Sequence, residues 1–557
     1  MNKVCKQCGS EFEITDEDIK YYDSISPIFD GQKFQIPTPK FCPPCRQQHR
    51  LAMRNERSLY HRKCDLTGKE IVSIYSQESP YKVYDQDIWW GDKWDPLEYG
   101  RDFDFSKTFE GNFKALYRDV PHMSLYTINC ENSYYTNYAL EQKNCYLIFG
   151  GGSNEDCLYG KFISKCKDCV DCLAVYACEK CYQGAGSDDC YDCKFFTHCR
   201  NCSESLMIEE CSSCRNCFAC FGLKSKQYCI LNKQYSREDY EKIEKDFKPL
   251  TLKKIEMLSQ KFFDLKKNLP HVQSHIYASE NCSGESVYNC KNCKYSFDSK
   301  NSEDCKFIHF TPKTNDTYDC SFCSPYGTRF CYNVCSTVDL ESSMACFYVW
   351  YGINLRYSME CHHCQDVFGS VGLKMKRYCV FNKQYSKEEY EKLVAKIICH
   401  MQETGEWGEY FNYSMSPFNY NETIAMEYFP LDKKDVEKLG GKWLNEKPEM
   451  AKKGEYFSPP ENINEVGDDI CGKVLKCETT GRAYKILPAE LKFYKKMGLP
   501  IPKICSDQRH YDRIKLHGYF RLWERKCDKC GKKIETVYEP QWKGIVYCEE
   551  CYLKEVY

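Results

Sequence analysis

The stretch CVDCLAVYACEKCYQGAGSDDCYDCKFFTHCRNC (residues 169–202) spaces its cysteines in multiples of three. A unit of Cys-x2-Cys-x5-Cys-x2-Cys begins at Cys169 and recurs 21 residues later at Cys190. All 17 cysteines from Cys130 to Cys229 share this phase. A short fixed period is typical of a solenoid, in which each coil buries its inner face against its neighbours. The sequence therefore predicts a parallel β-solenoid.

The residues around the cysteines support this prediction. Asn or Asp often precedes a cysteine, as in NCY and DCL, and both residue types tolerate the left-handed backbone that solenoid corners need. Cysteine would then act as a small buried hydrophobe, stacked from coil to coil.

A second, less regular array runs from Cys282 to Cys379. Its exit, GLKMKRYCVFNKQYSKEEYEKL (372–393), repeats GLKSKQYCILNKQYSREDYEKI (222–243) 150 residues on. The cysteine phase shifts between Cys323 and Cys346, so at least one coil contains an insertion or deletion. The sequence thus predicts a duplicated solenoid.

Two other interpretations of the core cysteines stay open: metal ligands, including an iron–sulfur cluster, and disulfides. Cys166, Cys169 and Cys172 resemble the start of a ferredoxin run, but the fourth cysteine and its proline are missing. The motif Cys361-His362-His363-Cys364 has ligand types, but its cysteines match repeat positions. Buried thiols are the favoured interpretation.

A helix should follow each array. Ser236 with Asp239, and Ser386 with Glu389, have capping-box spacing, and apolar residues follow at helical intervals. We expect these helices to cover the open ends of the solenoids.

Both ends of the chain carry paired Cys-x2-Cys motifs. Four thiolates in two such knuckles suit tetrahedral Zn²⁺. The predicted ligands are Cys5, Cys8, Cys42 and Cys45 at one end, and Cys527, Cys530, Cys548 and Cys551 at the other. We expect about two zinc ions per chain.

Each intact motif has a degenerate neighbour. CDLTG keeps Cys64, with Asp85 and Ile88 at the second knuckle, and CETTG keeps Cys477, followed by Cys505. RKCDLTGKEIVSIYS (62–76) recurs as RKCDKCGKKIETVYE (525–539), and FCPPCRQQHR (41–50) as ICSDQRHYDR (504–513). DEDIKYYDSI (16–25) likewise parallels PAELKFYKKM (488–497), which predicts a short helix between the knuckles. Since fewer than four ligands remain, we expect both degenerate copies to be metal-free and held by packing.

CKQCGSEF (5–12), IKYY (19–22) and FCPPCRQQHR together resemble the treble-clef module known as the probable zinc-ribbon domain. The whole chain resembles large cysteine-rich zinc-ribbon proteins of environmental bacteria. The resemblance implies zinc at the intact knuckles and a bacterial source, and implies no activity. The expected fold class is mainly β and multidomain, with the duplicated solenoid and its capping helices flanked by tandem treble-clef zinc ribbons.

Composition restricts the function. The 557 residues contain 42 cysteines, and their formal net charge is −2, which gives no sign of a polyanionic partner. The chain lacks an apolar run long enough for a membrane and a secretory signal, so reduced thiols in the cytoplasm are expected. No P-loop, G-x-S-x-G, H-E-x-x-H or dinucleotide fingerprint occurs, so no enzyme is predicted. Asp507, Arg509 and His510 lie beside a degenerate knuckle without a recognisable ligand set.

Local charge favours nucleic acid, RNA above all, as the partner. Residues 46–63 hold six basic residues and one acidic residue, and residues 503–533 hold ten basic and four acidic residues. The candidate contacts are Arg46, His49, Arg50, Arg54, Arg57, Arg62, Lys63, Arg509, His510, Arg513, Arg521, Trp523, Arg525 and Lys526. A solvated basic face is the plain alternative. A protein-interaction scaffold and a thiol-based metal or redox protein are the other two hypotheses.

The expected domains follow the order of these motifs. They are an intact ribbon at 1–63, a degenerate ribbon at 64–110, solenoid A at 125–235 with a capping helix at 236–270, solenoid B at 275–385 with a capping helix at 386–400, an aromatic-rich segment and linker at 401–470, a degenerate ribbon at 471–526 and an intact ribbon at 527–557.

Overall fold

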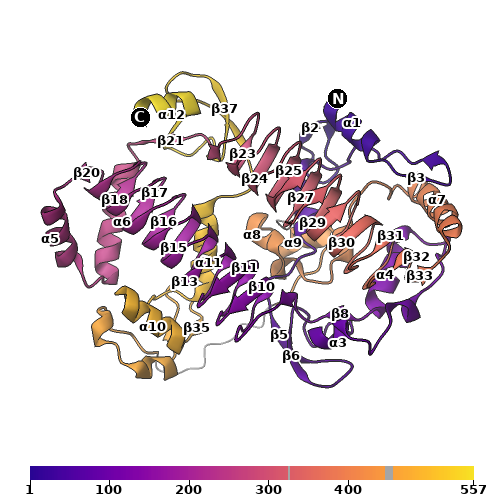
Figure 1. The fold of residues 1–557 in the computed structure, drawn as a ribbon, viewed down its shortest axis with the longest axis horizontal. Helices are drawn as coiled ribbons and strands as arrows, with labels where there is room; N and C mark the ends of the chain where they lie inside the picture. The colour runs from indigo at the N-terminus through magenta and orange to yellow at the C-terminus, as the bar shows by residue number, and fades with distance from the viewer. Residues whose placement is uncertain (324–325, 446–455, 557) are drawn as a thin grey trace. The chain divides into compact units, whose positions relative to one another are not determined.

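The computed structural model describes residues 1–323, 326–445 and 456–556 (Figure 1). This part of the chain is mainly β, with many parallel strands and twelve α-helices. It divides into two compact units. The first unit comprises Met1–Leu125, Ser274–Leu444 and Phe520–Leu522, and the second comprises Tyr126–Gln273, Asn445–Tyr519 and Trp523–Tyr557. Each unit therefore contains one cysteine array and one pair of knuckle motifs.

Array A, in the second unit, is a sheet of parallel strands that follow one another in the chain. Its strands are β9 (Thr127–Ile128), β10 (Asn137–Lys143), β11 (Phe149–Glu155), β12 (Lys161–Ser164), β13 (Lys167–Val170), β14 (Leu173–Tyr176), β15 (Glu179–Asp188), β16 (Tyr191–Thr197), β17 (Ser203–Glu209), β18 (Arg215–Phe221), β19 (Gln227–Ile230) and β20 (Lys233–Gln234). Each parallel pairing is offset by 12 residues, as between Asn137 and Phe149. Five of these strands form a closed ring of parallel pairings. Strand β11 pairs with β12 and β13, β15 pairs with β14 and β13, and β12 pairs with β14.

A left-handed residue at every third position bends the chain along array A. Asn144, Asp156 and Asp171 have φ of 54°, 54° and 59°, which confirms the role expected of Asn and Asp. Bulkier residues take the same conformation, among them Tyr159 with φ of 58°. A left-handed conformation costs such residues roughly 1–2 kcal/mol each, so the pairing and packing of the coils must offset it.

The residue after a left-handed position generally points inward, and in array A cysteine is the commonest residue there. These side chains form one continuous core in which Cys169, Cys181 and Cys193 are fully buried. Their thiols lie against backbone carbonyl oxygens: Cys169 Sγ is 3.3 Å from both Lys167 O and Cys178 O. A buried thiol is a weak donor, and the neighbouring backbone accepts its hydrogen bond.

Removing one core thiol should therefore lower the free energy of unfolding by little more than the lost packing contacts of its sulfur. We expect Cys193→Ala to lower the free energy of unfolding by about 1–2 kcal/mol, because the sulfur leaves a small cavity. Cys193→Ser should cost less, because Ser187 and Ser205 already occupy inner positions and donate to carbonyls two residues earlier, at 2.9 and 2.8 Å. Thermal denaturation of the two variants tests this order. A larger loss for serine than for alanine would contradict it.

Array B, in the first unit, has the same arrangement of parallel strands, but the offset between paired residues differs from 12 at two places. Its strands are β22 (Ile276–Tyr277), β23 (Gly284–Tyr288), β24 (Lys294–Lys300), β25 (Lys306–Pro312), β26 (Thr314–Asn315), β27 (Tyr318–Ser321), β28 (Thr328–Arg329), β29 (Tyr332–Glu341), β30 (Phe347–Arg356), β31 (Gln365–Phe368), β32 (Arg377–Val380) and β33 (Lys383–Gln384). The first pairing is offset by 11 residues, from Ile276 to Val287. The pairing of Tyr318 with Tyr332 is offset by 14, so the insertion predicted from the cysteine phase lies in this coil.

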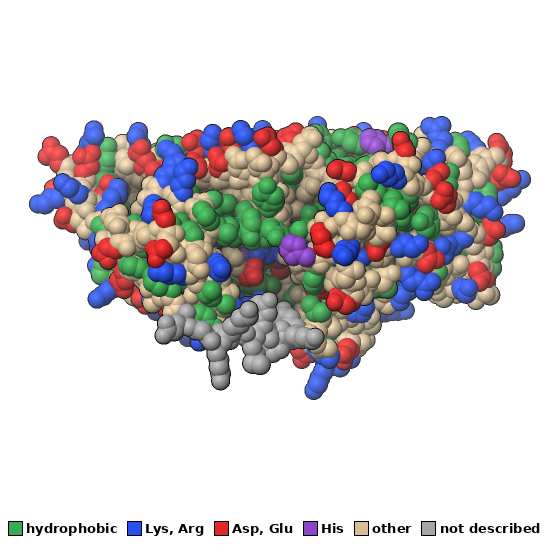
Figure 2. Space-filling model, turned by 90° about the horizontal axis from the view of Figure 1, so that it is seen from below, with side chains coloured by type: hydrophobic (Ala, Val, Ile, Leu, Met, Phe, Trp, Pro, Cys, Tyr) green, Lys and Arg blue, Asp and Glu red, His purple; other side chains and the backbone are tan. Residues whose placement is uncertain are grey.

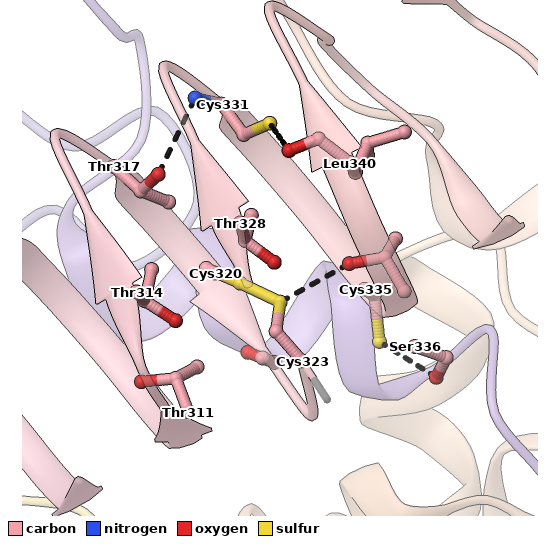
Figure 3. The surroundings of a disulfide bond; sticks show 12 residues. Thr311, Thr314, Thr317, Cys320, Cys323, Thr328, Cys331, Cys335, Ser336 and Leu340 are labelled. Carbon is pink, nitrogen blue, oxygen red and sulfur yellow. Dashed lines mark hydrogen bonds between the residues drawn. A yellow bond between two sulfur atoms is a disulfide. The ribbon is translucent and has the colours of Figure 1, made fainter. Parts of the chain in front are cut away.

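The coil before the insertion holds a disulfide. Cys320 and Cys323 are bonded to each other, and the other cysteines of the chain are free (Figure 3). Inner positions just before them carry Thr311, Thr314 and Thr317, all fully buried. At these three positions array B therefore carries hydroxyl side chains in place of thiols, and the disulfide accounts for one pair of cysteines only.

Each array ends in the same way. The last parallel strand, β19 or β32, turns back into a short antiparallel partner, β20 or β33. Ser236 and Ser386 then cap the helices α5 (Arg237–Phe247) and α7 (Lys387–Glu403), as the sequence predicts. Tyr240 of α5 packs on Tyr228, and Tyr390 of α7 packs on Tyr378, so both helices lie against the last strand of their array.

Four short antiparallel hairpins carry the knuckles. They are β1 (Asn2–Val4) with β2 (Glu11–Glu13), β5 (Tyr60–Lys63) with β6 (Glu70–Ser73), β34 (Leu475–Lys476) with β35 (Ala483–Tyr484), and β36 (Trp523–Lys526) with β37 (Lys533–Thr536). The helices that start at the second knuckles are α2 (Pro43–Leu51), α3 (Gln86–Trp90), α11 (Ser506–His517) and α12 (Glu549–Val556). The expected helices between knuckles are present as α1 (Asp16–Ser24) and α10 (Pro488–Met497).

The remaining described elements connect or flank these parts. They are α4 (Phe109–Asp119), α6 (Leu252–Lys266), α8 (Ile424–Tyr428), α9 (Lys433–Lys438), the strand pairs β3 (Ile28–Phe29) with β4 (Gln32–Lys33), β7 (Val83–Tyr84) with β8 (His122–Met123) and β21 (Pro270–Val272) with β38 (Ile545–Tyr547), and five 3₁₀ turns at Pro96–Tyr99, Tyr413–Met415, Tyr420–Glu422, Ile463–Glu465 and Asp468–Gly472. Within the aromatic-rich segment expected at 401–470, residues 446–455 lie outside the described part of the chain. None of the described helices is both long enough and apolar enough to cross a bilayer.

Candidate metal centres

One pattern of backbone hydrogen bonds occurs at four places. We call these knuckle modules 1 to 4, beginning at Cys5, Cys64, Cys477 and Cys527. In each module, the first cysteine N–H donates to the carbonyl five residues on, and the glycine four residues on donates to the cysteine carbonyl, at 2.8–3.0 Å. That glycine has φ between 70° and 73° in all four modules, a conformation that suits glycine. The degenerate copies therefore keep the backbone of the intact ones.

A second shared bond joins the two knuckles. The backbone N–H at the start of the second knuckle donates to the first cysteine sulfur, at 3.2–3.4 Å, in all four modules. The donors are Cys42, Asp85, Cys505 and Cys548. A hydrogen bond to sulfur favours the thiolate, which is the form that binds metal.

Module 1 and module 4 each bring four cysteine sulfurs together. In each group, Cys5, Cys8, Cys42 and Cys45 or Cys527, Cys530, Cys548 and Cys551, all sulfurs lie within 4.8 Å of one another. Cys8 and Cys42 sulfurs are 3.6 Å apart, and Cys530 and Cys548 sulfurs are 3.8 Å apart. A tetrahedral zinc with Zn–S bonds of about 2.3 Å would place its sulfurs about 3.8 Å apart. Both groups can therefore hold a metal ion.

Backbone donors also lower the pKa of a ligand thiol in module 4. Burial alone would raise the pKa of Cys527, but N–H groups of Cys530, Cys548 and Lys529 outweigh it and lower the pKa to about 6. Burial raises the pKa of Cys548, and a hydrogen bond with Cys548 raises the pKa of Cys551, so a cation must still displace protons from this group.

Modules 2 and 3 are incomplete in different ways. In module 2 only Cys64 remains. Asp85 takes the place of the first cysteine of the second knuckle, and its Oδ2 lies 3.3 Å from Lys69 Nζ. In module 3 one cysteine of each knuckle remains, Cys477 and Cys505. Thr480 occupies the second position, with Oγ1 3.9 Å from Cys505 Sγ. Neither module offers four thiolates.

Two arginines attach module 1 to array B. Helix α2 places Arg46 and Arg50 one turn apart, and both reach Asp319, which is fully buried. Arg46 Nε donates to Asp319 Oδ2 at 2.9 Å, and Arg50 Nη1 donates to Oδ1 at 3.2 Å. Two guanidinium groups thus share one carboxylate at a left-handed corner of the array.

The same arrangement attaches module 3 to array A. On α11, Arg509 Nε donates to Asp171 Oδ2 at 2.8 Å, and Arg513 Nη1 donates to Oδ1 at 2.9 Å. Burial alone would lower the pKa of Arg509, but Asp171 raises it above the usual value. Asp171 and Asp319 each directly precede an inner cysteine, so the two docking sites are copies of one another.

Several of the residues predicted to contact nucleic acid are buried in the folded chain. Eight of these candidates are at most 6% exposed: Arg46, His49, Arg50, Arg54, Arg62, Arg509, His510 and Arg513. Arg54 pairs with Glu56 and Arg62 with Asp65, both at 2.7 Å. Burial, with Arg50 nearby, lowers the pKa of His49 to about 3, so that ring is neutral. A count of basic residues could not reveal that these side chains are buried and that the arginines among them are paired with acidic residues in the folded chain.

The other six candidates are at least partly exposed. They are Arg57, Lys63, Arg521, Trp523, Arg525 and Lys526. Arg525 donates to the carbonyls of Glu539 and Trp542, at 3.3 and 3.2 Å. Basic and acidic side chains are interspersed on the face shown in Figure 2.

The core thiols do not form metal groups among the described residues. Besides the two four-cysteine sets, the groups of three or more described side chains that could share an ion consist of carboxylates and histidines. Cys361 and Cys364 are inner residues of array B, as repeat position predicts. Between them, His362 is buried against the rings of Trp89, Trp90 and Trp350. The motif is therefore core and not a ligand set.

One polar cluster gave no signal in the sequence. Glu209, Glu210 and His271 offer ligand atoms within 4.8 Å of one another in the second unit. Lys266 Nζ already lies 2.7 Å from a Glu209 oxygen, and Tyr538 and Tyr552 donate to Glu210 at 3.5 and 3.4 Å. Because both tyrosines belong to module 4, this cluster docks that module on array A.

No protein-family model matches the sequence, and no curated protein matches it. The function must therefore be inferred from the residues themselves.

Proposed function

We propose that the protein binds two zinc ions, one in module 1 and one in module 4, and that both are structural zinc-ribbon sites. The support is the donor set: four cysteine sulfurs from two knuckles, spaced as a tetrahedral ion requires. A site with four protein ligands leaves no coordination position for water or substrate. The zinc would therefore stabilise the modules and would not catalyse a reaction.

We further propose that arrays A and B are β-solenoids that act as rigid supports for the modules. The 12-residue offset, which is constant in array A and changes at two places in array B, and the left-handed residues at intervals of three favour this assignment. The arginine–aspartate contacts would fix module 1 to array B and module 3 to array A. The chain would then be a non-enzymatic binding protein.

A protein partner is favoured over nucleic acid. Phosphate contacts need solvent-accessible cations, and most of the basic candidates are buried in the folded chain. Aromatic rings remain on the array surfaces, with Tyr176 and Tyr191 37% and 39% exposed in array A and Tyr351 44% exposed in array B. Tyrosine is enriched in protein interfaces. Salt-dependent RNA binding that Lys63→Glu and Lys526→Glu reduce would overturn this choice.

Zinc content tests the proposal. Elemental analysis of the full chain, purified without oxygen, should give two zinc per chain. Cys8→Ser and Cys530→Ser should each lower the content by one, because three thiolates hold zinc less tightly than four. Cys399→Ser removes an exposed thiol outside the modules and should leave two zinc. Unchanged zinc in the first two variants, or iron in the wild type, would contradict the proposal.

A further inference from the structure

The two incomplete modules differ in what they can still bind. Module 2 has one sulfur, and its carboxylate already faces Lys69. Module 3 keeps one sulfur on each knuckle, at the first and third of the four ligand positions. These positions match Cys5 with Cys42 and Cys527 with Cys548, whose sulfurs lie within 4.8 Å of each other in the intact groups. Of the two incomplete modules, only module 3 therefore retains a thiol on each knuckle.

The surroundings of this pair are those of an intact site. Cys505 N–H donates to Cys477 Sγ at 3.4 Å, as the equivalent bond does in modules 1 and 4. Cys477 is fully buried and Cys505 is 6% exposed. Cys505 also caps α11, a helix of 12 residues, and the positive end of a helix favours a thiolate.

The other two ligand positions do not complete a zinc site. Thr480 offers a neutral hydroxyl at 3.9 Å from Cys505 Sγ. Gln508 turns away, and its Nε2 donates to Asp512 Oδ1 at 2.9 Å. Zinc requires four ligands, whereas a soft monovalent ion such as Cu(I) is satisfied by two thiolates in a nearly linear arrangement.

We propose that Cys477 and Cys505 form a two-thiolate site for a soft monovalent metal ion of the Cu(I) class. Binding would release the thiol protons and join the two knuckles through the metal, where zinc would join them in an intact module. The site goes beyond the proposed zinc function and does not depend on it, since its ligands belong to neither zinc group.

The test is an anaerobic titration of the zinc-loaded full chain with Cu(I) bound to a coloured, weakly competing chelator. A second dye reports released zinc. The protein should take the first equivalent of Cu(I) from the chelator, and no zinc should be released. In Cys505→Ser, and separately in Cys477→Ser, the first equivalent should stay with the chelator or displace zinc. Cys64→Ser, in module 2, is the matched control and should behave as the wild type.

Copper X-ray absorption of the wild-type chain with one equivalent of Cu(I) requires no variant, so it does not depend on whether a variant folds. It should show two sulfur ligands. Three or more sulfurs, or a wild type that titrates like Cys505→Ser, would place the copper elsewhere and overturn the proposal. Failure of the zinc assignment would instead appear as missing zinc before any copper is added.

Discussion

Asp171→Asn should lower the free energy of unfolding of the second unit by about 3–5 kcal/mol, because it leaves two buried guanidinium groups without their carboxylate. Asparagine has the same shape and tolerates the left-handed backbone at this position, so the loss reports the charge. In this variant Glu490 still pairs with Arg509, at 3.2 Å. Thermal and urea denaturation of the full chain measure the effect.

The matched control is Asp168→Asn. Asp168 is also a left-handed residue of array A and pairs with Lys496 at 2.5 Å, but its side chain is 26% exposed. Its loss should cost less than about 1 kcal/mol, as for other ion pairs near the surface. Asp319→Asn should match Asp171→Asn in the first unit, since it also holds two buried arginines. Equal small losses at Asp171 and Asp168 would mean that the arginines do not attach the module.

Thr480→Cys combined with Gln508→Cys should add a third zinc ion to the chain. The two substitutions place thiols at the second and fourth ligand positions of module 3, which already has the hairpin, the left-handed glycine and the knuckle-to-knuckle hydrogen bond. Structural zinc in small peptides contributes about 10–16 kcal/mol of apparent binding free energy, so a backbone that needs no rearrangement should bind firmly. Elemental analysis of the purified double variant counts the ions.

Module 2 supplies the control for this experiment. Thr67→Cys restores a thiol there, but Asp85 and Ile88 remain at the second knuckle. This variant should keep two zinc ions. If the double variant in module 3 also keeps two, then its incomplete knuckles have moved away from zinc geometry, and shared backbone bonds would not be a sufficient criterion for a metal site.

Much of the fold could be predicted from spacing alone. Cysteines in a single phase modulo three place all inner residues on one side of a repeating coil, and the phase shift after Cys323 located the insertion between β27 and β29. The intact knuckles were equally clear, because a four-cysteine site is formed by short segments with fixed local geometry. Such features depend on few residues close in sequence.

The docking of the modules could not be predicted in this way. Whether an arginine meets solvent or a buried aspartate depends on contacts between residues hundreds of positions apart. A signal was nevertheless present: FCPPCRQQHR and ICSDQRHYDR keep both arginines although one has lost half of its cysteines. Residues kept after the metal ligands have decayed serve the packing, and this reading would have identified Arg509 and Arg513 as anchors.

The reversal of direction at β20 and β33 also limits how the protein can assemble. A parallel ladder with a bare final strand is a template on which another chain can add coils, and such edges promote fibre growth. Here the final strand of each array pairs with its own antiparallel return, and a capped helix follows. At this end, the number of strands in each sheet is thereby fixed within the chain. A high cellular concentration of such a cysteine-rich protein should not, at these two ends, seed its polymerisation.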